Sequence, residues 1–155
     1  MDVAGAARAL FLVCLASAAA WAASVILRRR LGAPLDLGLE LPDGRPLFGS
    51  HKTWRGVAAA ILACALAAPF LQLEVATAAG FGAAAMLGDA LSSAIKRRLA
   101  LEPGAEVLGL DQLPEALLPL VLFAEPLRIG AVEIAVVALA FVGLDLLAAP
   151  LRRRT

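Results

Sequence analysis

Long apolar runs, separated by two polar stretches, dominate the sequence. We expect helices over four of these runs, at residues 5–27, 57–73, 75–95 and 129–149. Each run is close to the ~20 residues that a helix needs to cross a bilayer. The polar stretches at 28–56 and 96–110 are expected to be loops, because the first is rich in Gly and Pro and the second contains Pro103-Gly104.

The apolar stretch from Leu113 to Ala124 gives a weaker signal. It is about a dozen residues long, which is short of a full crossing unless it extends at both ends. Pro114 suits the first turn of a helix, whereas Pro119 would kink one. We expect a fifth helix over 111–125, with a re-entrant segment as the alternative.

The composition indicates a membrane protein. The chain has 155 residues, of which 61% are hydrophobic, whereas a soluble domain carries roughly 45–50% apolar residues. Too few polar residues remain to cover a water-soluble globule. We therefore expect an all-α integral membrane protein that forms a single domain over residues 1–155.

Clusters of basic residues predict how the helices are oriented. These clusters are Arg28-Arg29-Arg30, Lys52 with Arg55, Lys96-Arg97-Arg98 and Arg152-Arg153-Arg154. Cytoplasmic segments carry an excess of Lys and Arg, and five crossings place all four clusters on the same side. We expect a multi-pass protein of the cell membrane with five transmembrane helices, the N-terminus outside and the C-terminus cytoplasmic. A cleaved signal peptide is the alternative for 5–27, but signal peptides carry their positive charge before the apolar core.

One apolar helix ends in polar residues that share a face. Asp89, Ser92, Ser93 and Lys96 are spaced i, i+3, i+4 and i+7. A carboxylate in an apolar helix is costly and marks a candidate functional site, although Asp89 could instead pair with Lys96 or a neighbouring Arg. The cations of Lys96-Arg97-Arg98 would neutralise phosphates, or serve only as anchors to anionic lipid.

Asp111 lies in the second loop, which the expected topology brings to the same membrane surface as Asp89. Mg²⁺ commonly takes one or two carboxylates and completes its shell with phosphate and water. We therefore expect Asp89 and Asp111 to hold Mg²⁺ against substrate phosphates; the alternative is that Asp111 caps the following helix. Such a site suits phosphoryl or nucleotidyl transfer, which depends on positioning and charge neutralisation.

Three further features bear on which ligands the protein could bind. Lys52-Thr53-Trp54-Arg55, flanked by Gly49 and Gly56, adds two cations and a hydroxyl at the start of the second helix. The pattern of a P-loop is missing from the sequence. Cys14 and Cys64 lie in apolar runs and are expected to be packing residues.

These motifs together resemble those of the CDP-archaeol synthases, a branch related to the phosphatidate cytidylyltransferases. The matching pieces, in the order of the family, are Gly44 to Gly49, Lys52 to Gly56, Gly88-Asp89 with Ser93 and Ile95, Lys96-Arg97-Arg98, Pro103-Gly104 and Asp111-Gln112. The chain departs from the family pattern at Pro114, where the pattern has a second Asp. Glu115 is the nearest replacement, so the number of metal ions, one or two, stays open.

The resemblance implies an Mg²⁺-dependent enzyme of five membrane spans that uses CTP. It implies that Asp89, Lys96 and Asp111 are catalytic, with Asp89 and Asp111 as the metal ligands. The residues expected to bind substrate are Lys52, Thr53, Arg55, Ser93, Arg97, Arg98 and Gln112.

We predict a CTP-dependent cytidylyltransferase that converts a membrane lipid phosphate, of archaeol or phosphatidate type, to its CDP-activated form and releases pyrophosphate. The alternatives are a lipid kinase that uses CTP or ATP, a small membrane transporter and a non-enzymatic scaffold. The expected partners are CTP, the lipid phosphate and membrane lipids, with no nucleic acid. A homo-oligomer stays open, as does ether or ester linkage in the lipid. The active site is expected on the cytoplasmic face.

Overall fold

The prediction of an all-helical protein is confirmed. The computed structural model of the chain describes residues 2–28, 30–102, 105 and 107–152. Its helices are α1 (Val3–Leu27), α2 (Trp54–Ala67), α3 (Val75–Arg98), α4 (Gln112–Leu122), α5 (Ala124–Leu127) and α6 (Ala131–Arg152). The predicted turn at Pro103-Gly104 and the basic residues Arg29, Arg153 and Arg154 lie outside the described residues.

The helix bounds differ from the sequence prediction mainly at two places. Helix α2 ends at Ala67 rather than at residue 73, because Pro69 has no N–H to continue the hydrogen-bond ladder and the chain then turns through Gln72, whose φ is 55°. The segment predicted as one helix over 111–125 is divided. Helix α4 ends at Leu122 and α5 begins at Ala124.

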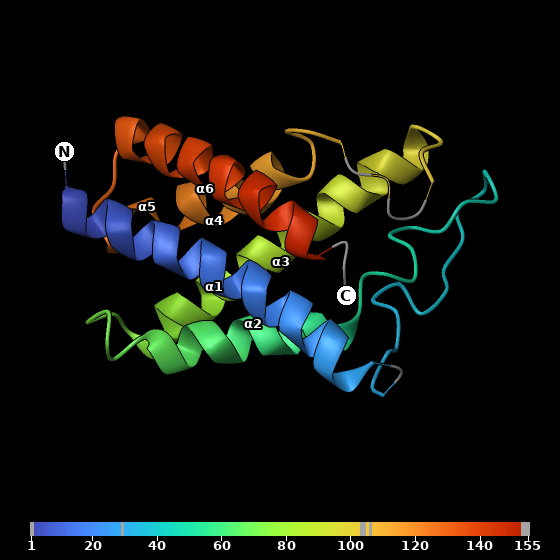
Figure 1. The fold of residues 1–155 in the computed structure, drawn as a ribbon, viewed down its shortest axis with the longest axis horizontal. Helices are drawn as coiled ribbons and strands as arrows, with labels where there is room; N and C mark the ends of the chain where they lie inside the picture. The colour runs from blue at the N-terminus through green and yellow to red at the C-terminus, as the bar shows by residue number, and fades with distance from the viewer. Residues whose placement is uncertain (1, 29, 103–104, 106, 153–155) are drawn as a thin grey trace.

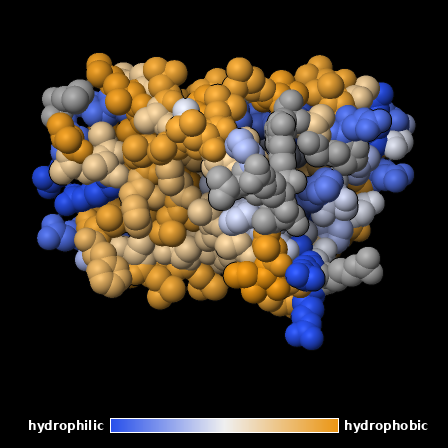
Figure 2. Space-filling model, in the orientation of Figure 1, coloured by the Kyte–Doolittle hydropathy of each residue, from blue (hydrophilic) through white to orange (hydrophobic). Residues whose placement is uncertain are grey.

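Within the part of the chain that the structure describes, three helices are long and apolar enough to cross a membrane. These are α1, α3 and the part of α6 from Ala131 to Pro150, whereas α2 and α4 are shorter apolar helices. Large apolar side chains are exposed along the bundle, among them Phe11 and Leu139. Figure 2 shows hydrophobic residues over the middle of the molecule and hydrophilic residues at its two ends, as in a protein surrounded by lipid.

Helix α3 is the central element of the bundle. It packs against α1, α2 and α4, while α6 packs against α1 and α4. Two glycines of α3 allow this close packing. A Cβ at Gly82 would lie 2.8 Å from the carbonyl oxygen of Ala60 in α2, and one at Gly88 would lie 2.8 Å from the Cα of Glu115 in α4.

The two ends of the bundle carry different structures. The N-terminus, the α2–α3 turn and α5 lie at one end, while residues 30–53, 99–102 and 107–111 lie at the other, together with the C-terminal ends of α1 and α3 (Figure 1). We call this second end the loop end. The predicted site residues gather there, since Lys52 and Asp111 lie in its loops and Asp89 and Lys96 lie on the last turns of α3.

Candidate active site

A single carboxylate, Asp36, organises the first loop. Its Oδ2 atom accepts hydrogen bonds from the backbone N–H groups of Phe48 and Gly49, both at 2.9 Å, and its Oδ1 atom accepts one from Gly38 at 3.1 Å. Burial would raise the pKa of Asp36, but these three N–H donors outweigh it and hold the pKa below its ordinary value. This role was not predictable from the sequence, because no motif surrounds Asp36.

Backbone pairing then fixes the direction of Lys52. The backbone N–H of Leu35 donates to the carbonyl oxygen of Lys52 at 2.7 Å, and that of Trp54 donates to Ala33 at 3.2 Å. Pro34 and Thr53 form an isolated antiparallel bridge between these bonds. The two segments of the loop therefore run side by side immediately before α2 begins, and they hold the Lys52 side chain toward α3.

Two ion pairs connect the loops to the end of α3. The Nζ atom of Lys52 lies 2.5 Å from Oδ2 of Asp89, and the Nζ atom of Lys96 lies 2.6 Å from Oδ1 of Asp111. Lys96 also donates a hydrogen bond of 2.9 Å to the carbonyl oxygen of Ala105. Asp89 is thus paired with a lysine of the first loop, and not with Lys96 of its own helix.

Asp111 occupies the N-cap position of α4, but its side chain does not cap the helix. Its Oδ2 atom instead accepts a hydrogen bond of 3.0 Å from the backbone N–H of Val107, which lies earlier in the same loop. The capping alternative is therefore wrong. The carboxylate is directed back into its own loop and toward Lys96.

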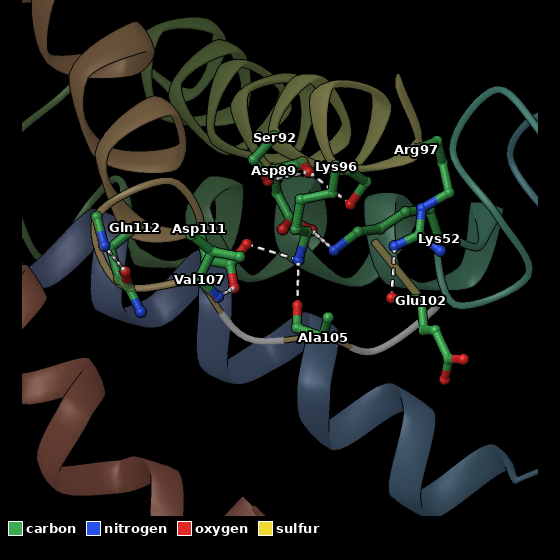
Figure 3. A network of polar contacts seen from close by, with 12 residues as sticks. Lys52, Asp89, Ser92, Lys96, Arg97, Glu102, Ala105, Val107, Asp111 and Gln112 are labelled. Atoms are coloured by element: carbon green, nitrogen blue, oxygen red, sulfur yellow. Dashed lines mark hydrogen bonds and ion pairs between the residues drawn. The ribbon is translucent and has the colours of Figure 1, made fainter. Parts of the chain in front are cut away.

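All four charged groups line one pocket of about 490 Å³ at the loop end. Figure 3 shows the side chains of Lys52 and Lys96 directed toward Asp89 and Asp111, with Gln112 at the start of α4. Of the ten site residues predicted from the sequence, six line this pocket: Lys52, Thr53, Asp89, Lys96, Asp111 and Gln112.

The other four predicted residues bind protein groups outside the pocket. The hydroxyl of Ser93 donates to the carbonyl oxygen of Asp89 at 3.1 Å. The Arg55 guanidinium donates to the carbonyl oxygens of Arg28 and Arg30, just beyond the C-terminus of α1. A substrate contact by these two residues, or by Arg97 and Arg98, stays a prediction.

The arginines at the end of α3 hold the two loops. Arg97 donates from Nη2 to the carbonyl oxygen of Glu102 at 2.7 Å. Arg98 binds both carboxylate oxygens of Asp43 at 2.7 Å, and Arg45 donates in return to the carbonyl oxygens of Arg97 and Arg98. The two bonds from Arg45 thus reach carbonyl groups in the last turn of α3, where a helix has carbonyl oxygens beyond its own hydrogen-bond ladder.

The pocket also contains residues outside the ten site residues predicted from the sequence. The most informative are the acids Glu115 of α4 and Asp145 of α6, together with Ser17 and Trp21 of α1. Glu115 is only 8% exposed and forms a hydrogen bond with Ser17. Of the two acids, Glu115 was indicated only as a replacement for the family's second Asp, and no motif surrounds Asp145 in the sequence.

The charges of the pocket suit a bound cation. Four carboxyl groups, of Asp89, Asp111, Glu115 and Asp145, face the two ammonium groups of Lys52 and Lys96. Within the described part of the chain, no three His, Cys, Asp or Glu side chains converge on a metal position. Such a donor set fits Mg²⁺, which uses one or two carboxylates together with phosphate and water rather than an all-protein cage.

Comparison with known proteins identifies the family. A family model described as CarS-like, CDP-archaeol synthase, matches residues 7–150. The chain belongs to the CDP-archaeol synthase family. A solved structure described as "Structural insight into an intramembrane enzyme for archaeal membrane lipids biosynthesis" is 31% identical to the chain, with a TM-score of 0.74. That likeness covers 91% of this chain and 92% of the other.

Curated CDP-archaeol synthases resemble the chain over a shorter region. The protein from Hyperthermus butylicus is 46% identical over 94 residues, which are 57% of this chain and 56% of that protein. The one from Pyrococcus furiosus is 37% identical over 91 residues, or 52% and 54% of the two chains. The chain spans little more than half the length of the curated CDP-archaeol synthases it matches. With its long apolar helices, this member of the family is a membrane-embedded protein.

Proposed function

We propose that the chain is a CTP-dependent cytidylyltransferase that converts a membrane lipid phosphate to its CDP-activated form and releases pyrophosphate. The observation that carries this proposal is the pocket at the loop end, where Lys52 and Lys96 meet Asp89 and Asp111 beside apolar helices. A lipid phosphate and a nucleoside triphosphate are both anions, and this pocket places two ammonium groups next to apolar helices.

In the proposed reaction an oxygen of the lipid phosphate attacks the α-phosphorus of CTP. The new P–O bond forms as the bond between the α-phosphorus and the bridging oxygen to the β-phosphorus breaks, and pyrophosphate leaves with the electron pair of that bond. The nucleophile is already anionic near neutral pH, so the protein does not need to supply a general base. This agrees with a pocket whose only His, among its described residues, is the exposed His51.

The two lysines would change partners during binding. Each ammonium group is paired with a carboxylate in this structure, and phosphate oxygens compete for the same donors. Lys52 and Lys96 would then neutralise charge on the phosphates, which is the main requirement of phosphoryl-transfer chemistry. Mg²⁺, when held by Asp89 and Asp111, would supply further charge neutralisation at the phosphates. These roles for the lysines and the acids are part of the proposal.

The proposed topology has five crossing segments, with the N-terminus outside and the loop end in the cytoplasm. The two short helices need their neighbours to cross: α2 with the turn at 68–73, and α4 with α5. Basic residues at the loop end, among them Arg28, Arg30, Lys52 and Arg98, support a cytoplasmic position for it. CTP would then reach the pocket from the cytoplasm.

The test is turnover by purified protein in lipid nanodiscs with CTP, Mg²⁺ and a lipid phosphate that is either ether-linked or ester-linked. We expect pyrophosphate and a lipid whose mass includes cytidine monophosphate. A phosphorylated lipid without cytidine would indicate a lipid kinase instead, and no product with either lipid would contradict the proposal. Asp89→Asn should abolish product formation, while the matched variant Glu40→Gln, an exposed acid outside the pocket, should retain it.

A further inference from the structure

Asp145 is an acidic residue that the proposed reaction does not use. It lies in the apolar helix α6, about 30 positions along the chain from the motifs that form the rest of the pocket, yet it lines that pocket. A carboxylate in an apolar helix carries a large desolvation cost, and such residues are retained mainly where they have a function. Its contacts indicate what this function is.

Asp145 binds the first residue of α4. Its Oδ2 atom accepts a hydrogen bond of 3.0 Å from Nε2 of Gln112. The other end of the same amide is also engaged, because Oε1 of Gln112 accepts a hydrogen bond of 2.9 Å from the backbone N–H of Gly109. Gln112 is 7% exposed. An amide held at both ends has one orientation, and the carboxylate of Asp145 determines it by accepting only from the NH₂ group.

Gly109, which donates to Gln112, is the residue at which the chain turns before α4. Gly109 has a φ of 82°, a conformation that favours glycine. The turn is closed by hydrogen bonds from the N–H of Asp111 to the carbonyl oxygen of Val107, at 3.2 Å, and from Val107 N–H to the Asp111 carboxylate, at 3.0 Å. Gln112 therefore holds one side of this turn and Asp111 the other.

The direction of the Asp111 carboxylate depends on this turn. With Oδ2 engaged by Val107, Oδ1 is left facing Lys96 across the pocket, at 2.6 Å. If the turn around Gly109 opened, Val107 would move, and the Asp111 carboxylate would lose the hydrogen bond from Val107 that orients it. The chain of contacts from α6 thus runs through Asp145, Gln112 and Gly109 to the position of Asp111.

We propose that Asp145 is a positioning residue of the active site, which sets the turn at residues 107–111 through Gln112 and so aims the carboxylate of Asp111 into the pocket. The inference deepens the proposed function and rests on it for its effect on turnover. The effect on the turn itself is independent of any reaction.

Two variants of Asp145 separate positioning from stability. Asp145→Leu removes the acceptor but suits an apolar helix, so the bundle should remain as stable as the wild type. Asp145→Asn keeps an oxygen that accepts from Nε2 of Gln112, and it serves as the conservative control. The first readout is hydrogen–deuterium exchange of the peptide that contains Gly109, measured without nucleotide or lipid.

We expect faster exchange at this peptide in Asp145→Leu, with exchange in α1 and α3 unchanged, and near wild-type exchange in Asp145→Asn. The kcat for CDP-lipid formation should fall by roughly 10–100-fold in Asp145→Leu, as is typical when the support of a site residue is lost, and Asp145→Asn should restore most of it. The KM for the lipid should change little, since the apolar helices are intact.

A double variant gives a second, independent test. If Asp145 acts through Gln112, adding Asp145→Leu to Gln112→Leu should cost no further activity, because residues in one network are not additive. If the fold-loss of activity in the double variant equals the product of the fold-losses in the two single variants, the proposal is contradicted. Unchanged exchange at Gly109 in Asp145→Leu would also overturn it, even if turnover fell. If no variant, including the wild type, forms a CDP-lipid, only the proposed function fails, and the exchange result still decides the role of Asp145.

Discussion

The Nζ atom of Lys52 lies 2.5 Å from Oδ2 of Asp89, and this ion pair joins two positions that are 37 residues apart. It connects the first loop to the last turns of α3, and each side chain keeps 25% of its surface exposed. The pair therefore faces the pocket and is accessible to a ligand. A phosphate that enters the pocket meets an ammonium group whose present partner is a second anion.

This relationship predicts the effect of removing the charge of Lys52. Lys52→Met keeps an unbranched side chain, and we expect turnover to fall by about 10²–10³-fold, as when one charge-stabilising donor is lost from an active site. Lys52→Arg should retain part of the activity. Pyrophosphate release measures both, and Arg30→Met is the matched control, because Arg30 is an exposed cation that does not line the pocket. Equal losses in Lys52→Met and Arg30→Met would show that only surface charge matters.

Gly88 should be intolerant of a larger side chain. A Cβ there would overlap the carbonyl group of Pro114 and approach the Cα of Glu115, so Gly88→Ala must push α4 away from α3. We expect a loss of about 1–3 kcal/mol in the free energy of unfolding, the usual cost of overpacking, and a larger loss of activity because Asp89 and Asp111 move apart.

The control for Gly88 is Gly143 of α6, where an added Cβ would meet no atom within 4 Å. Gly143→Ala should leave activity unchanged and stabilise the helix by up to ~1 kcal/mol through its better helix propensity. Unfolding in detergent measures both variants. A Gly88→Ala protein as stable and active as Gly143→Ala would contradict the close packing of α3 and α4.

The sequence was sufficient to predict the helical fold and the position of Asp89 and Asp111 at the same end of the bundle. Both follow from strong signals: long apolar runs, and basic clusters that place the two loops at one end. The partners of these acids were not predictable. Lys52 reaches Asp89 because Asp36 shapes the first loop, and two of the three N–H groups that Asp36 binds, those of Phe48 and Gly49, are close to it only after folding.

Helical periodicity alone also did not show where the hydroxyl groups of α3 point. Ser92 and Ser93 share a face with Asp89 in sequence, but both hydroxyls donate to the carbonyl oxygen of Asp89 within the helix. Serine hydroxyls commonly return to the backbone one turn earlier. The roles of Arg45 and Arg55 at helix ends were missed for a related reason, since a capping guanidinium has no pattern in the sequence around it.

The ion pair between Arg98 and Asp43 predicts that exchanging the two charges between these positions restores a function lost when only one is changed. The two side chains are 34% and 41% exposed, so their ion pair should contribute about 1 kcal/mol or less to stability. Residues 40–46 form a hairpin closed by an antiparallel bridge between Glu40 and Pro46, and the role of the ion pair is to hold this hairpin against α3. Arg98→Asp should loosen this hairpin and lower activity, and Asp43→Arg combined with it should recover both.

The matched comparison is between this double variant and Arg98→Asp alone, measured by limited proteolysis of the hairpin and by turnover. If Arg98 binds a substrate phosphate, as the family resemblance implies, the reversed pair should close the hairpin but stay inactive. If its role is the contact seen in this structure, activity should return with the hairpin.

The carboxylate of Asp36 predicts how the first loop responds to pH. Burial raises its pKa, but hydrogen bonds from the backbone of Gly49, Phe48 and Gly38 outweigh this effect and hold the pKa below its ordinary value. A group whose pKa is lowered by folding contributes stability that is fully present above its unfolded pKa and is lost as the pH falls through its folded pKa. The loop should therefore keep its structure from neutral pH down to about 4 and open only below that.

Trp54 reports on this opening, because its backbone N–H binds Ala33 at the base of the loop. In a Trp21→Phe background it is the one remaining tryptophan of the two in the sequence. We expect its fluorescence to be constant between about pH 7 and pH 5 and to change below about pH 4. Asp36→Asn should show the open-loop signal at every pH, since an amide offers one acceptor oxygen where the carboxylate uses two, and turnover should fall with it because Lys52 loses its position. A wild-type transition near neutral pH, or a closed loop in Asp36→Asn, would contradict the role of Asp36.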